Sequence, residues 1–245
     1  MTQRSWLFPL RFLLVTLALL ALTTLFSTLA SRLKKDAEPT VLEEPLLFST
    51  VILDAGHGGE DGGAVSSQGY LEKDLNLAIC RQMEGMLKAN GINTVMTRSE
   101  DILLYDKNVD YQGRKKALDL LARRKIGEET EDALFVSIHM NSYPIAKYHG
   151  LQVWYSPNNE SSFEVAKQIR STVLEELQPE NDRQVKEAGS TLYLLHHLHS
   201  PAVLVECGFL SNPEEAERLN DPTYQKQLAF LITLSILQSN FPLQK

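Results

Sequence analysis

Four residues of types that bind metals or transfer protons stand where the sequence predicts strands to end or a helix to begin. His57 follows the apolar run VILDAG, His139 follows LFVSI, and Glu206 follows AVLV. The fourth residue, Glu72, lies fifteen residues after His57, near the start of a predicted helix. In α/β folds the carboxyl ends of parallel strands meet at one rim of the sheet, where ligands bind. We therefore expect His57, His139 and Glu206 to lie close together.

Two histidines and one carboxylate form the ligand set of many catalytic zinc sites, in which the fourth position is left for water. The long spacing of these residues matches none of the compact zinc motifs. We interpret His57, Glu72 and His139 as ligands of one zinc ion, and Glu206 as the general acid and base. Glu72 also has a simpler interpretation, because a glutamate in the first turn of a helix is favoured by the macrodipole. Asp74 is able to fill that role instead.

The glycine-rich loop around His57, GHGGEDGG, has to be weighed as a phosphate-binding loop. It lacks the Lys-Ser/Thr ending of a P-loop, and it does not match G-x-G-x-x-G. Glu60 and Asp61 within the loop would repel phosphate. We interpret the glycines as leaving room beside His57 for a metal ion and a bulky substrate.

The elements that must position these residues alternate between strands and helices. Several strand-like runs are near-continuous apolar segments, which is typical of strands buried on both faces. The pattern predicts an α/β domain with a largely parallel sheet and helices on both faces. Strands are expected at 50–55, 93–98, 133–139, 151–156 and 202–207, and helices at 75–87, 112–125, 161–177, 213–219 and 223–238.

The N-terminal region contains twenty residues without a charge, bracketed by Arg11 and Arg32. Twenty helical residues span about 30 Å, which is enough to cross the hydrocarbon core of a membrane. Thr28-Leu29-Ala30 is a poor cleavage site, so we expect an uncleaved signal-anchor rather than a cleaved signal peptide. We divide the chain into a cytoplasmic basic flank (1–11), the membrane segment (12–31), a linker (32–48) and a catalytic domain (49–241).

The composition limits the partners of the domain. The 245 residues are 43% hydrophobic and carry a formal charge of −7. Beyond residue 35 there are 19 basic against 31 acidic residues, a net charge of −12. An acidic domain repels phosphate backbones, so no nucleic-acid partner is expected. The two cysteines, Cys80 and Cys207, lie in apolar patterns and are expected to be buried free thiols.

Five sequence elements together carry a family resemblance. LDAGHGGEDGGA, LEKDLNLAI, VMTR, FVSIHMNS and PAVLVECGFLSNPEEAERL occur in this order and at this spacing in zinc-dependent N-acetylmuramoyl-L-alanine amidases. The chain resembles this family over nearly all of residues 49–240. The resemblance implies a mixed, mostly parallel sheet, a zinc ion bound by His57, Glu72 and His139, and a catalytic Glu206. It also implies cleavage of the amide between the lactyl group of N-acetylmuramic acid and L-alanine.

The resemblance further implies a peptidoglycan substrate. One membrane segment, a short linker and a bare catalytic domain are similar to the sporulation-type member, which acts on spore-cortex peptidoglycan. We expect the domain to be anchored outside the cytoplasmic membrane, or secreted if the N-terminal segment is cleaved. We find no wall-binding repeats in the sequence, so substrate capture rests on the domain itself, on tethering or on a protein activator.

Two alternative functions remain. The same two histidines and glutamate would serve another zinc amidohydrolase, such as a carboxypeptidase that acts on wall peptides. A catalytically silent wall-binding module is the other alternative, and Glu206 argues against it because a silent domain does not need that residue.

A second histidine cluster lies in LLHHLHSP and comprises His196, His197 and His199. On a strand, His197 and His199 would face the same way and would be able to bind a second metal ion. We expect instead a solvated loop before the strand that carries Glu206.

Overall fold

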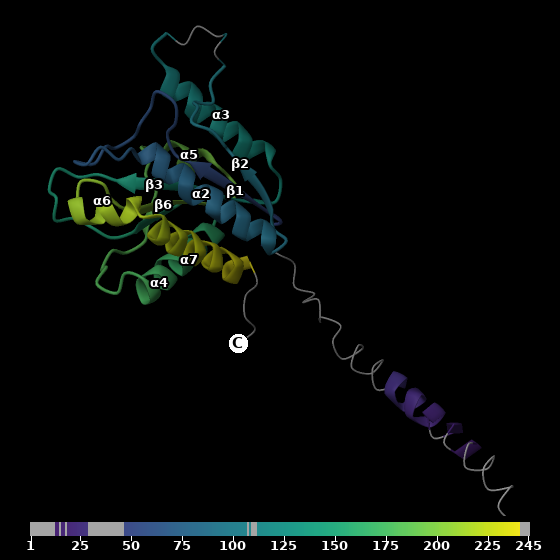
Figure 1. Cartoon of the computed structure of the whole chain (residues 1–245). Coiled ribbons are helices and arrows are strands. Elements are labelled where there is room, and N and C mark those ends of the chain that lie inside the picture. The colour runs from purple at the N-terminus through teal and green to yellow at the C-terminus, as the bar shows by residue number, and fades with distance from the viewer. Residues whose placement is uncertain are drawn as a thin grey trace, which may run out of the picture. The chain divides into compact units, whose positions relative to one another are not determined.

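In the computed structural model, which describes residues 13–14, 16–17, 19–28, 47–106, 108 and 112–240, a six-stranded sheet forms the centre of the domain (Figure 1). The strand order is β2-β1-β3-β6-β4-β5. The first four strands run parallel, β4 is antiparallel to β6, and β5 is parallel to β4. The predicted mixed, mostly parallel sheet is therefore confirmed. The strands are β1 (Thr50–Ala55), β2 (Asn93–Met96), β3 (Ala133–Asn141), β4 (Gln152–Tyr155), β5 (Lys186–Glu187) and β6 (Ala202–Phe209).

Helices cover both faces of the sheet, as the sequence predicts. Because side chains alternate along a strand, Leu53 and Val136 pack on one face, and Ile52 and Phe135 on the other. The helices α2, α4, α6 and α7 pack on the first face, and α3 and α5 on the second (Figure 1). Their bounds are α2 (Glu72–Ala89), α3 (Lys115–Glu129), α4 (Ser161–Glu176), α5 (Tyr193–His197), α6 (Pro213–Asn220) and α7 (Pro222–Asn240).

The register of the parallel strands determines which residues share a rim. His139 of β3 is the direct partner of Glu206 in β6. Ala55, the last residue of β1, is paired with Ile138, so the loop that carries His57 leaves the sheet beside His139. The three residues predicted at strand ends therefore meet at one rim of the sheet.

Two short elements differ from the expectation. The segment with His196 and His197 was expected to be a solvated loop, but it contains the helix α5. Its Leu194 and Leu195 are buried in the same apolar cluster as Phe135, and this burial stabilises a helix that is too short to be recognised by periodicity. The two-residue strand β5 at the edge of the sheet was not predicted either.

The N-terminal end of the domain begins slightly before the predicted boundary. Phe48, assigned to the linker, is 1% exposed and belongs to the core. Its backbone N–H donates to Asn240 Oδ1 (3.1 Å), and Asn240 Nδ2 donates back to its carbonyl oxygen (2.9 Å). These two bonds join the start of the domain to the end of α7. Cys80 and Cys207 are buried free thiols, as expected.

The chain divides into two units, Met1–Pro45 and Leu46–Lys245. The predicted membrane segment is described at 13–14, 16–17 and 19–28, where it is helical. Among the residues described, no helix combines the length and the apolar character that crossing a membrane requires. The remaining residues of the membrane segment, the basic flank 1–11 and residues 32–46 of the linker lie outside the described residues.

Candidate metal centre

The loop after β1 presents His57 with an unusual backbone conformation. Its φ is 62°, in the left-handed region that costs a non-glycine residue roughly 1–2 kcal/mol. Gly58 and Gly59, which follow, also have positive φ values of 140° and 54°. With this backbone, His57 Nε2 lies 3.2 Å from Glu72 Oε1, and Nδ1 lies 2.9 Å from Asp61 Oδ2. Both ring nitrogens of His57 thus face a carboxylate.

Glu72 is the first residue of α2, and its carboxylate accepts hydrogen bonds from backbone N–H groups of two segments outside that helix. Oε2 accepts the backbone N–H of Ala64 (2.7 Å), and Oε1 accepts that of Met140 (3.1 Å). The residue is 3% exposed. Burial acts to raise the pKa of Glu72, but the contacts with His139 and His57 outweigh it and hold the pKa well below its usual range. Glu72 is therefore an ionised, buried carboxylate at the rim of the sheet, rather than a cap of α2.

His139 completes the group from the end of β3. Its Nδ1 lies 2.9 Å from Glu72 Oε1, and its ring stands edge-on to that of His57, with ring centroids 5.0 Å apart. Two glycines make room for these side chains. A Cβ at Gly56 would lie 2.3 Å from the His139 ring, and a Cβ at Gly63 would lie 2.5 Å from Glu72 Oε2. The glycines that were interpreted as open space for a substrate are thus also required by the ligand side chains themselves.

The three side chains fit a metal ion. One possible ligand atom from each of His57, Glu72 and His139 lies within 4.8 Å of the others. Two nitrogens and one carboxylate oxygen are the donor set of many catalytic zinc sites. Asp61 contacts Nδ1 of His57, the ring nitrogen that does not face Glu72. Metal-binding histidines commonly contact a carboxylate through the ring nitrogen that does not bind the metal.

The second histidine cluster shows a different arrangement. His197 Nδ1 lies 2.8 Å from the carbonyl oxygen of Tyr193, one turn earlier in α5. The rings of Tyr193 and His197 stack with centroids 4.3 Å apart. These contacts explain His197 as part of a helix rather than as a ligand of a second metal ion.

Glu206 lies beside this group, as the cross-strand partner of His139. Burial raises its pKa to about 7; His139 and His57 act to lower it, and Glu72 adds to the increase. Its Oε2 is buried and has no hydrogen-bond partner among the residues described. A carboxyl group that titrates near neutral pH and is not bound to the protein is suited to accept and donate a proton.

A cavity of about 210 Å³ adjoins the site on the face covered by α3 and α5. His57 and His139 contribute to it from the sheet rim, Lys116 and Leu120 from α3, and Tyr193 from the region of α5. The cavity combines charged and apolar side chains next to the candidate metal ligands, as substrate pockets commonly do.

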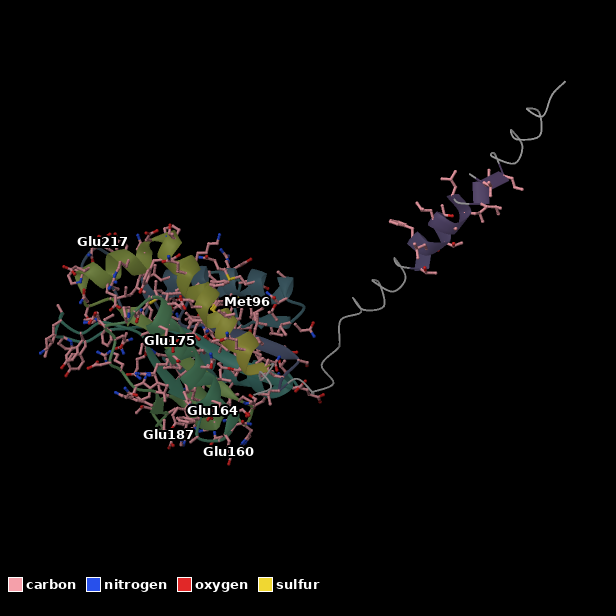
Figure 2. All side chains as sticks on the ribbon, turned by 90° about the horizontal axis from the view of Figure 1, so that it is seen from below. Met96, Glu160, Glu164, Glu175, Glu187 and Glu217 are labelled. Atoms are coloured by element: carbon pink, nitrogen blue, oxygen red, sulfur yellow. The ribbon has the colours of Figure 1, made fainter. Side chains whose placement is uncertain are left out.

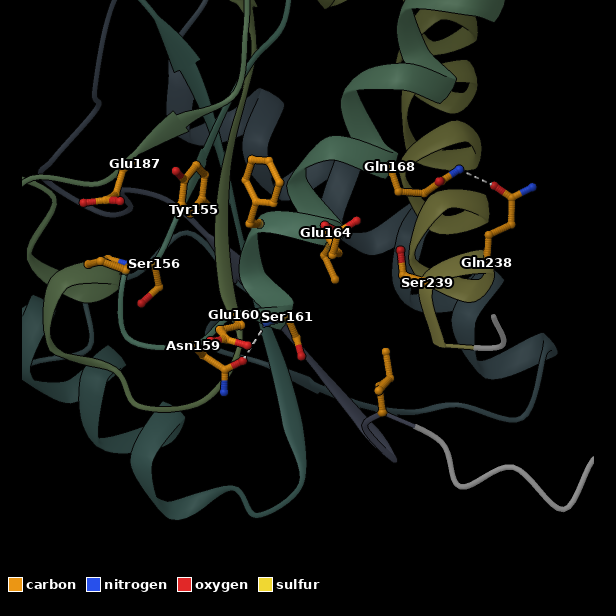
Figure 3. A pocket seen from close by; sticks show the side chains of 14 residues that line it. Tyr155, Ser156, Asn159, Glu160, Ser161, Glu164, Gln168, Glu187, Gln238 and Ser239 are labelled. Carbon is orange, nitrogen blue, oxygen red and sulfur yellow. Dashed lines mark hydrogen bonds between the residues drawn. The ribbon is translucent and has the colours of Figure 1, made fainter. Parts of the chain in front are cut away.

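A larger groove lies elsewhere, at the other end of β6. Tyr155, which lines it, is paired with Val203 near the start of that strand. Glu160, Glu164 and Glu187 contribute acidic side chains to the groove, as Figure 3 shows, and they gather on one side of the domain in Figure 2. The groove contains none of the four predicted site residues.

Sequence reasoning assigned no role at the site to several residues that lie beside or beneath it. Asp61 was noted only for its charge, although its position four residues after His57 in a loop was a signal. Arg98 and Arg123 are fully buried and donate to the backbone of the His57 loop. Asp54 is a charged residue inside an apolar strand, which should have indicated a buried partner.

Comparisons with known proteins agree with this arrangement. A model of a family described as N-acetylmuramoyl-L-alanine amidase matches residues 51–238. Over 194 residues the chain is 37% identical to the germination-specific N-acetylmuramoyl-L-alanine amidase of Bacillus subtilis (strain 168), covering 79% of this chain and 81% of the relative. It is similar to the CwlD amidase from Clostridioides difficile, solved in complex with the GerS lipoprotein, with 36% identity, a TM-score of 0.74, and coverage of 78% of this chain and 98% of that one. The amidase AmiC2 of Nostoc punctiforme is 32% identical with a TM-score of 0.65, covering 80% of this chain and 98% of that one.

Proposed function

The chain belongs to the N-acetylmuramoyl-L-alanine amidase family, and we propose that His57, Glu72 and His139 hold the one zinc ion of this enzyme. As an amidase of this family it hydrolyses the bond between N-acetylmuramic acid and the L-alanine of the stem peptide. The observation that carries the zinc proposal is the convergence of two histidine nitrogens and a buried carboxylate oxygen within 4.8 Å at the rim of the sheet. The same rim carries Glu206 on the neighbouring strand.

The residues around this site divide the chemistry between them. Zinc in such a site lowers the pKa of water toward ~7 and polarises the carbonyl that is attacked. Glu72 stays ionised because both histidines stabilise its charge. Asp61 faces Nδ1 of His57, which keeps Nε2 directed at the centre of the site. The contacts with the two histidines thus favour the ionised, metal-binding form of Glu72 before any ion is bound.

Glu206 is the proposed general base and acid. Burial raises its pKa to about 7, toward the range in which a carboxyl group can both accept and donate a proton at neutral pH. The ionised form takes a proton from the attacking water, and the protonated form passes that proton to the amine nitrogen of the departing L-alanine.

The biological setting is also a proposal. The relative from Bacillus subtilis is named germination-specific, which supports spore-cortex peptidoglycan as the substrate. The Clostridioides difficile amidase was solved with a lipoprotein, which supports a protein partner for this chain as well. The uncharged segment 12–31 supports anchoring in the cytoplasmic membrane, with the catalytic domain on the outer side.

Product analysis tests the proposed function. Full-length protein loaded with zinc is incubated with purified muropeptides, and mass spectrometry is expected to detect free stem peptides that begin with L-alanine. Release of a terminal D-alanine would instead indicate a carboxypeptidase, and binding to the wall without any product would indicate a silent module. Parallel digests of cortex and vegetative peptidoglycan test the substrate, and faster cleavage of cortex is expected.

A further inference from the structure

A buried arginine on α3 contacts the backbone of the His57 loop. Arg123 is 1% exposed, and its Nη2 donates to the carbonyl oxygen of His57 at 2.6 Å. Its Nη1 donates to the carbonyl oxygen of Ala55 at 2.8 Å. These bonds bracket the point where the chain leaves β1 and turns into the left-handed conformation at His57.

Two carboxylates hold the guanidinium group of Arg123 in place. Nε donates to Asp119 Oδ2 (2.7 Å), and Nη1 donates to Asp54 Oδ1 (2.6 Å). Asp54 is in turn bound by Thr97 Oγ1 (2.8 Å) and by Ser137 Oγ (2.6 Å). Burial disfavours the charge, but Asp54 and Asp119 outweigh it and raise the pKa of Arg123. The planar guanidinium therefore has one orientation, in which its remaining N–H groups point at the loop.

The packing of α3 does not depend on this arginine alone. Leu120 and Ile126 of the same helix pack against the apolar cluster that contains Phe135. Two of the bonds from Arg123 reach the carbonyl oxygens of Ala55, the last residue of β1, and of His57 in the loop, rather than groups of α3. A residue that only anchored α3 would not need these two hydrogen bonds, whereas a residue that orients the His57 loop would.

We propose that Arg123 is a positioning residue, which holds the strained backbone of His57 so that the imidazole Nε2 meets Glu72 and His139. It acts through the carbonyl oxygen of His57 and is not one of the three proposed metal ligands, although it also lines the cavity beside them. The inference rests on the zinc site proposed above. A neighbouring arginine, Arg98, supplies a matched comparison, because it is equally buried and donates to the carbonyl oxygens of Ala55 and Gly56 but not to that of His57.

The test compares Arg123→Lys with Arg98→Lys in the full-length protein. Both substitutions keep the positive charge, but a lysine ammonium cannot reproduce the fork that joins two carboxylates and two carbonyl oxygens. Zinc affinity is measured by competition with a chelator, at a temperature where circular dichroism shows each variant to be folded. Loss of a residue that orients a metal-binding histidine typically weakens metal binding about 10–100-fold. We expect a loss in that range for Arg123→Lys and a loss of less than threefold for Arg98→Lys.

Each result decides the inference. If Arg123→Lys is folded and binds zinc as tightly as the wild type, or if both variants lose affinity equally, Arg123 has no specific positioning role. If Arg123→Lys does not fold, the zinc affinity of Asp119→Asn is measured instead, because Asp119 orients Arg123 and is not one of the proposed metal-binding residues. An unchanged zinc affinity in that variant overturns the inference, whereas a weaker one supports it. A wild-type protein that binds no zinc would refute the proposed metal site instead.

Discussion

Replacing Gly56 by alanine should displace His139, one of the proposed metal ligands, without changing any of the three ligand residues themselves. Gly56 follows β1, and a Cβ built on its backbone would lie 2.3 Å from both Cε1 and Nε2 of His139. Ordinary van der Waals contact begins near 3.4 Å. The φ value of Gly56 is not among the positive ones, so the expected effect is one of space rather than of backbone conformation.

The required displacement can be compared with the tolerance of a metal site. To relieve this overlap, the His139 ring or the loop has to move by about 1 Å, whereas metal–ligand distances vary by only about ±0.2 Å. Forcing one extra carbon into a packed region costs about 1–3 kcal/mol of stability. Loss of a residue that only orients a metal ligand typically weakens metal binding about 10–100-fold. We expect Gly56→Ala to weaken zinc binding by at least about 100-fold, because it displaces a proposed ligand directly. The protein should remain folded, with a modestly lower melting temperature.

Zinc competition titration, thermal unfolding and muropeptide digestion measure these three effects. Gly85→Ala is the control, because Gly85 lies in α2, where an added Cβ would meet no atom within 4 Å, and alanine is favoured there by about 0.5–1 kcal/mol. This variant should bind zinc and digest muropeptides like the wild type. A folded Gly56→Ala variant with zinc affinity within threefold of the wild type would show that the site does not depend on the fit between Gly56 and His139.

Three further predictions follow from the charged groups of the site. Glu206→Gln should lower kcat about 10²–10⁴-fold in the digestion assay while zinc affinity stays within threefold of the wild type, and retention of full activity would exclude Glu206 as the acid and base. Removal of zinc with a chelator should abolish activity, and zinc added back at 100 times its Kd should raise the free energy of unfolding by about 2.7 kcal/mol; a melting temperature that does not respond to zinc would contradict the metal site. Arg123 and Ser137 hold the pKa of Asp54 below its usual 3.8 against the effect of burial, so its ionised form contributes stability that is fully present above 3.8 and is lost as the pH falls through the lower folded pKa. The difference in unfolding free energy between the wild type and Asp54→Asn should therefore shrink between pH 5 and about pH 2 in urea titrations, and a constant difference would refute the linkage.

The position of the site was predictable because it depends on strand order and strand ends. Apolar runs that end at His57, His139 and Glu206 are visible in the sequence, and parallel pairing brings such ends to one rim. Glu72 was harder to assign, since a glutamate at a helix start also has a common structural role. Its structural neighbours, the N–H groups of Ala64 and Met140, come from distant segments that no local pattern connects.

The elements that were missed are those whose formation depends on tertiary contacts. The helix α5 is five residues long, and short helices are stabilised by packing rather than by their own propensity. Arg123 lies among the basic residues of α3, where Lys116 and Lys125 are more than half exposed. Nothing in the sequence of α3 shows that this one side chain turns inward to meet Asp54, which lies 69 positions earlier.

The buried charges beneath the site follow from the shape of the loop itself. A chain that leaves a parallel strand in a left-handed turn cannot continue the sheet, so its carbonyl oxygens lose their ladder partners while they are still inside the protein. Arg98 and Arg123 donate to the carbonyl oxygens of Ala55, Gly56 and His57, which meets this requirement without water. The buried guanidinium group of Arg123 in turn requires buried carboxylates, and Asp54 of β1 provides one of them. The turn that brings His57 to the proposed metal site therefore accounts for the arginines, and Arg123 accounts for the aspartate in an otherwise apolar strand.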